Sequence, residues 1–139
     1  MDATLPLSPA SRTTAGILLL TIVFIEYGGW FVLRVVRGRQ PKTPFQQTFA
    51  RAGHGHAGIL VTLALVGQVL ADAASLSGLP AVLAREGIPV AAVLVPAGFF
   101  FSSAGRGATQ PNRLVVLIYV GMAALAVGVV ALGAGLLAA

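Results

Sequence analysis

The chain has 139 residues, a net charge of +5, 57% hydrophobic residues and only 9% charged residues. Soluble domains carry about 25% charged residues, so this composition excludes an ordinary water-soluble domain. Its basic residues stand between apolar runs rather than among aromatic residues, so we expect no nucleic-acid partner, and the lack of cysteine excludes disulfides and thiolate metal sites.

Four apolar stretches approach the roughly 20 residues that a helix needs to cross a hydrocarbon core of about 30 Å. We predict spans at about residues 14–36, 50–74, 88–104 and 114–139. The second helix begins somewhere between Phe45 and His54. We expect Pro80 and Pro89 to mark the connection before the third span, which leaves that span short. We expect Pro96 to kink the third helix. The predicted fold class is all-α: a polytopic transmembrane four-helix bundle forming one domain.

Basic residues are distributed unevenly between the connections. Two, Arg12 and Arg85, precede the first and third spans, and the other seven surround the first and third connections: Arg34, Arg37, Arg39, Lys42, Arg51, Arg106 and Arg113. Because cytoplasmic loops are enriched in Lys and Arg, we predict a multi-pass protein of the cell membrane with both termini extracytoplasmic. Arg34, Arg37, Arg39 and Arg51 are also candidates for contacts with anionic lipid headgroups or other anions, although orientation alone explains them.

Glu26 is a carboxylate in the middle of the first apolar span. It lies ten residues before Val36, which is about 15 Å from the cytoplasmic end at 1.5 Å per residue. A carboxylate at this depth costs several kcal/mol unless it is paired, hydrated or protonated. Glu26 is therefore either one half of a pair with another helix or a neutral acid that fixes packing.

His54 and His56, near the start of the second span, are the candidate partners. If the second helix begins at Phe45, His56 lies about 16 Å deep and level with Glu26; a start at Arg51 leaves it only about 7 Å deep. Pro44 and the helix-forming residues after it favour the earlier start.

The second span also carries a polar stripe. At about 100° per residue, His54, Gln68 and Asp72 share one face, and His56 lies on the opposite face. A carboxylate, two imidazoles and an amide in one small bundle are typical of a proton relay. The predicted ligand or relay residues are therefore Glu26, His54, His56, Gln68 and Asp72. The alternatives are an interhelical hydrogen bond for Gln68, a helix-end role for Asp72 and interfacial histidines.

These residues lead to three functional hypotheses. The first is proton-linked transport or channel activity in a homo-oligomer, because four short helices form a thin bundle with little room for an internal cavity. The second is a membrane enzyme or redox subunit that binds haem, quinone or a thiol cofactor. The third is a non-catalytic partner or assembly subunit of a membrane complex. The sequence identifies no particular cofactor or metal, and the bilayer is the one partner that composition requires.

The stretches FIEYGGWFVLR and PFQQTFARAGHGHAGILV resemble small four-span membrane proteins of actinobacteria, which implies topology but no activity. In size, span count and the basic residue opening the second span, the chain is also similar to the trimeric MAPEG family of glutathione-dependent enzymes. That similarity implies a glutathione contact at Arg51, but His56 or Ala57 stands where the family has Asn, and the family's Glu is absent. A third similarity is to haem-bearing helices of the heme-copper oxidase type, which often open with a histidine followed by an apolar run.

Overall fold

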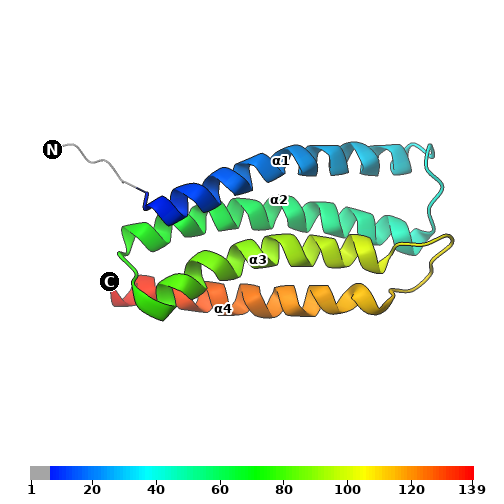
Figure 1. Cartoon of the computed structure of the whole chain (residues 1–139). Helices are drawn as coiled ribbons and strands as arrows, with labels where there is room; N and C mark the ends of the chain where they lie inside the picture. Colours follow the sequence, from blue (N-terminus) through cyan, green and yellow to red (C-terminus); the bar gives the residue numbers. More distant parts are fainter. Residues whose placement is uncertain (1–6) are drawn as a thin grey trace.

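The computed structural model describes residues 7–139 as four long helices that run alternately up and down (Figure 1). They are α1 (Pro9–Val36), α2 (Pro44–Ala73), α3 (Gly78–Ser102) and α4 (Val116–Ala138), with a 3₁₀ turn at Arg113–Val115 before α4. Each is long and apolar enough to cross a membrane. The predicted all-α four-helix bundle is confirmed.

Local capping explains where α2 begins. The side chain of Thr43 accepts a hydrogen bond from the backbone N–H of Gln46, whose side chain accepts one from the N–H of Thr43. Pro44 occupies the first helical position, where no N–H donor is needed. The helix therefore takes the earlier of the two predicted starts, and His56 lies three turns inside it.

The third helix extends beyond the predicted third span. α3 begins at Gly78 rather than Ile88, and it continues through Pro89 and Pro96. Pro80 is tolerated because the first four N–H groups of a helix have no intrahelical acceptor. Pro89 is tolerated for a different reason, since a side chain of α2 takes over the hydrogen bond that the proline removes.

The closest helix pair is α3 with α4. A Cβ atom built on Gly87 would lie 2.8 Å from the carbonyl oxygen of Ala124 and 2.8 Å from the Cα of Gly128. A Cβ on Gly121 would lie 2.7 Å from a methyl of Val95. Glycine at these positions therefore lets the two backbones touch, as small residues commonly do between helices in membranes.

In contrast, α1 is loosely held. It packs along α2, meets α3 at few positions, and buries only Ser11, Leu18 and Val35. The bundle is therefore open on one side, and a space remains between α1 and α3 above α2.

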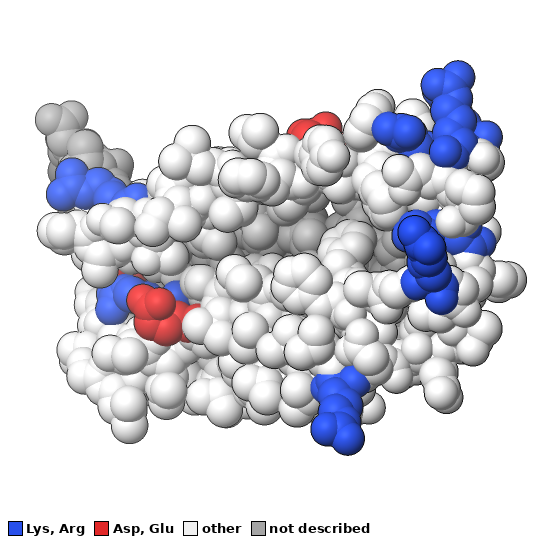
Figure 2. All heavy atoms as spheres, turned by 45° about the vertical axis from the view of Figure 1, so that its right-hand side comes forward, with Lys and Arg blue, Asp and Glu red and all other residues white. Residues whose placement is uncertain are grey.

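The two ends of the bundle differ in charge. The α1–α2 and α3–α4 connections lie at one end, where the side-chain amide of Gln46 donates to the backbone oxygens of Ser103 and Gly105. Most of the Lys and Arg side chains visible in Figure 2 gather at this end. The chain termini and the α2–α3 connection lie at the other end (Figure 1).

Candidate functional site

A groove of about 650 Å³ lies between α1 and α3, with α2 as its floor. Figure 2 shows the surface hollowed there. Its lining is almost entirely apolar and includes, from the three helices, Ile17, Thr21, Phe24, Ile25, Ala57, Val61, Val90, Val93 and Leu94. The size is in the range of sites that hold small molecules, and a lining of this kind suits an apolar one.

Two ionisable side chains mark the ends of the groove. His54 of α2 lies near one end and Glu86 of α3 lies near the other. His54 is level with Phe99, because a Cβ atom on the neighbouring Gly53 would lie 3.0 Å from the Cβ of Phe99. Glu86 precedes Phe99 by thirteen residues, so the groove is about 20 Å long at 1.5 Å per residue.

The imidazole of His54 is held against two glycines of α1. A Cβ atom on Gly29 would lie 3.1 Å from Cε1 and 3.3 Å from Nε2 of the ring, and one on Gly28 would lie 3.6 Å from Nδ1. Residues with larger side chains would separate α1 from the ring. The half-buried ring lines the groove and makes no hydrogen bond to any residue of the described chain, so its hydrogen-bonding capacity is unused there.

The α3 wall carries two prolines. Pro89 and Pro96 are seven residues apart, hence on one face of the helix, and both line the groove. Since proline has no N–H, Pro96 leaves the carbonyl of Ala92 without its usual helical donor. Ala92 also lines the groove. This carbonyl is a second hydrogen-bonding group near an otherwise apolar surface.

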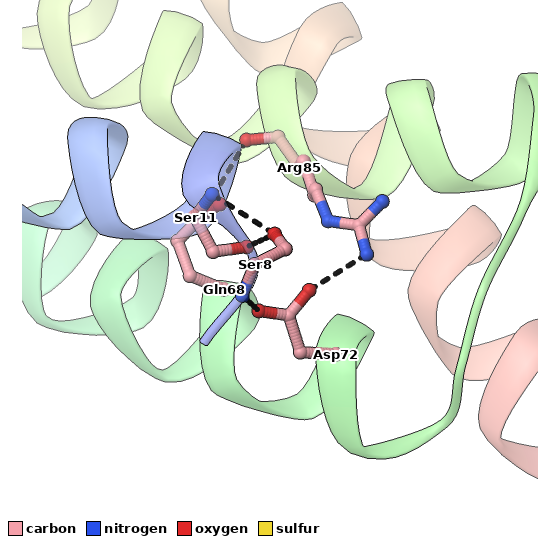
Figure 3. A network of polar contacts seen from close by, with 5 residues as sticks. All are labelled: Ser8, Ser11, Gln68, Asp72 and Arg85. Atoms are coloured by element: carbon pink, nitrogen blue, oxygen red, sulfur yellow. Dashed lines mark hydrogen bonds and ion pairs between the residues drawn. The ribbon is translucent and has the colours of Figure 1, made fainter. Parts of the chain in front are cut away.

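A separate polar network joins three helices at the end of the bundle that carries the termini (Figure 3). Asp72 accepts 2.8 Å and 2.7 Å hydrogen bonds from the backbone N–H of Ser8 and from the guanidinium of Arg85. The amide of Gln68 donates to the carbonyl oxygen of Arg85 at 2.8 Å. Ser11 donates its N–H to the side chain of Ser8. The network pins the start of α1 to α2 and α3.

The five predicted relay residues therefore do not form one chain of contacts. Gln68 and Asp72 belong to the polar network, and His54 lies in the groove about 20 Å from Gln68 along α2 at 1.5 Å per residue. Gln68 makes the interhelical hydrogen bond, and Asp72 the contact near a helix end, that were expected as alternatives; a part for either in a proton relay stays a prediction.

Glu26 and His56 lie elsewhere again. Both are exposed, and across residues 7–139 neither forms an ion pair. The Nδ1 of His56 lies 2.8 Å from the carbonyl oxygen of Ala52, and its ring packs 5.1 Å from that of Phe99. The two residues lie about level along the bundle, but no contact joins their side chains. Within one chain the structure does not bring Glu26 to either histidine.

The predicted basic contacts lie at one end of the bundle. Arg34 sits 4.8 Å from the ring centroid of Trp30, a cation–π distance. Arg37, Arg39 and Arg51 are exposed. Their contact with lipid headgroups stays a prediction.

Two charged residues of these sites, and the serines Ser8 and Ser11 of the polar network, were not predicted from the sequence. Glu86 and Arg85 fall outside the predicted third span, because Pro89 was expected to end the loop before it. A Pro in the first turn of a helix, as Pro80 is, removes no intrahelical hydrogen bond, so a helix that begins before Pro80 was compatible with the sequence and places both residues inside α3.

The part of the chain that the structure describes contains no group of three His, Cys, Asp or Glu side chains arranged to hold a metal ion. No protein-family model matches the chain, and comparison with curated proteins and with solved structures found no significant match. The resemblances to the actinobacterial group, to MAPEG enzymes and to oxidase helices therefore stay predictions.

Proposed function

We propose that this chain is a membrane-embedded binding protein that holds a neutral, lipid-soluble molecule with a hydrogen-bonding ring, of the quinone class, in the groove between α1 and α3. The observation that carries the proposal is an apolar groove of about 650 Å³ with His54 at one end and no hydrogen bond from its ring to the described protein. An isoprenoid tail fits a groove about 20 Å long.

Selectivity comes from the polar groups. Lipid tails are as apolar as the groove, so moving a tail from the bilayer into it gains little. A hydrogen bond from the ring to His54 contributes about 0.5–1.5 kcal/mol, or roughly three- to tenfold in affinity. Glu86 at the other end repels a carboxylate, which favours a neutral ligand over a fatty acid.

The test uses a short-chain prenylated quinone and the purified protein in detergent. Trp30 is the only tryptophan, so quenching of its fluorescence reports binding. His54→Phe should raise Kd roughly three- to tenfold by removing the hydrogen bond. Val93→Phe, which fills the groove, should abolish saturable quenching.

Val130→Phe on the exposed surface of α4 is the matched control, because it adds the same bulk outside the groove. It should leave Kd unchanged. Quenching that does not saturate would show that the quinone only partitions into detergent, and this would overturn the proposal. An equal effect of Val93→Phe and Val130→Phe on quenching would overturn it in the same way.

Proton-linked transport by a homo-oligomer is the second candidate. What supports it is Glu26, an exposed carboxylate near the middle of an apolar helix, where contact with lipid is costly. If this residue carries protons, Glu26→Gln should abolish proton flux into liposomes. Flux that is unchanged by Glu26→Gln at several pH values would eliminate this role.

A further inference from the structure

Glu26 and His56 lie on the side of the molecule opposite the groove. At about 100° per residue, Glu26 is about 200° from Gly28, which lines the groove, and His56 is about 200° from His54. Both side chains are exposed there. Glu26 belongs to α1, and His56 lies at the edge of α2 next to α3, because its ring packs on Phe99. We call this surface the back face.

The two residues are level along the bundle. Gly28 and Gly29 of α1 contact the ring of His54 on α2. Because the helices are antiparallel, stepping from these glycines to Glu26 and from His54 to His56 moves in the same direction, by about 3–5 Å in each case. Glu26 and His56 are therefore within about one helical turn of the same depth.

Between them, α2 presents two glycines to open space. A Cβ atom on Gly55 or on Gly58 would have no neighbouring atom within 4 Å. Around α2 these glycines come between the side that faces α1 and the position of His56. The back face thus has an acid on one side, an imidazole on the other, and a backbone surface between them that another helix can approach closely.

We propose that a second copy of this chain covers the back face, and that Glu26 of each copy pairs with His56 of the other. Copies inserted in the same orientation are related by an axis parallel to the helices. A two-fold axis that passes beside the glycines of α2 brings the α1 side of one copy's back face against the α3 side of the other copy's back face. It therefore places the acid of each copy opposite the imidazole of the other, twice in the dimer.

The chemistry of the pair is complementary. The carbonyl of Ala52 can only accept, so Nδ1 of His56 donates to it, and Nε2 faces outward. Nε2 and the carboxyl of Glu26 then share one proton in a hydrogen bond. The contact removes an acid from lipid, which is the largest unfavourable exposure on α1. It lies on the other side of α2 from the groove and does not depend on a ligand there.

The first experiment is disulfide cross-linking in native membranes. The chain has no cysteine, so Ile59→Cys, beside the proposed axis, introduces a single thiol. Ile59 and Val130 are similarly exposed, at 71% and 68%, which makes Val130→Cys the matched control. Copper phenanthroline should convert the Ile59→Cys chain to a covalent dimer and leave the control monomeric. A cross-link to another protein, or equal dimer from both variants, would overturn the proposal.

The second experiment tests the pair by exchanging its members. Glu26→His and His56→Glu should each lower the dimerisation constant about three- to twentyfold, measured by energy transfer between labelled chains in liposomes. The double variant restores an acid opposite an imidazole and should return to within about twofold of the parent. Both side chains are exposed. His56→Glu also loses the ring contact with Phe99, but the double variant lacks that contact too, so a recovery in it reports the pair alone. The Glu26–His56 contact would be ruled out if the single variants dimerised as strongly as the parent. It would also be ruled out if the double variant dimerised no more strongly than the single variants.

Discussion

The side-chain amide of Gln68 donates a 2.8 Å hydrogen bond to the carbonyl oxygen of Arg85, the same carbonyl that Pro89 deprives of its helical donor. An interior proline and a buried glutamine on different helices thus compensate for each other. The contact supplies a hydrogen bond that α3 would otherwise lack, at the residue next to Glu86 of the groove.

This relationship predicts a specific coupling. Gln68→Leu should lower the free energy of unfolding by about 1–3 kcal/mol, because a buried carbonyl loses its partner. Pro89→Ala restores the helical N–H, so Gln68→Leu should cost less in that background. A double-mutant cycle by steric trapping in bicelles measures the difference. Strictly additive effects would mean that the glutamine does not replace the missing donor.

A second prediction concerns the ion pair that anchors α1. Asp72→Ala should cost about 2 kcal/mol of unfolding free energy, less than the roughly 3–5 kcal/mol for a fully buried pair, because Arg85 and Asp72 are 19% and 11% exposed. It also frees the N–H of Ser8, so hydrogen exchange should increase in the first turn of α1. Asp72→Asn keeps an acceptor oxygen and should show a smaller increase. Unchanged exchange in α1 would contradict the anchoring role.

Glycine contacts between α3 and α4 give a third prediction. Gly87→Ala places a methyl against the backbone of Ala124 and Gly128, which cannot turn aside as a side chain can. We expect a loss of about 1–3 kcal/mol of unfolding free energy. Gly133→Ala is the control, since a Cβ there has no neighbour within 4 Å, and it should cause no loss. Equal effects in reversible unfolding by SDS would argue against close backbone packing.

The orientation in the membrane is tested by thiol labelling of the cysteine-free chain. Thr109→Cys lies in the α3–α4 connection and Ser77→Cys in the α2–α3 connection, at opposite ends of the bundle. If the basic end is cytoplasmic, an impermeant maleimide added to intact cells should label only Ser77→Cys. Labelling of Thr109→Cys alone would reverse the predicted orientation.

The sequence predicts the helices better than their faces. Hydropathy and length were enough to find four apolar helices, and Pro44 with the helix-forming residues after it correctly predicted the early start of α2. The helix α3 begins ten residues before the predicted third span because Pro80 and Pro89 suggested a connection there, and the compensation of Pro89 by Gln68 depends on a contact between helices. Depth alone likewise could not show that Glu26 and His54 face away from each other, since that follows from how α1 leans on α2.

The glycine pair of α1 offers the last prediction, because Gly28 and Gly29 differ in how closely they approach His54. A methyl on Gly29 would lie 3.1 Å from the ring, tighter than ordinary contact, whereas one on Gly28 would lie at 3.6 Å, an ordinary van der Waals distance. Gly29→Ala should therefore displace the imidazole and raise the Kd for the short-chain quinone roughly three- to tenfold, as loss of the hydrogen bond would. Gly28→Ala should change Kd less than twofold. Both substitutions add one methyl to the same helix and favour helix formation equally. If the two variants bind alike, the position of the His54 ring does not determine binding in the groove.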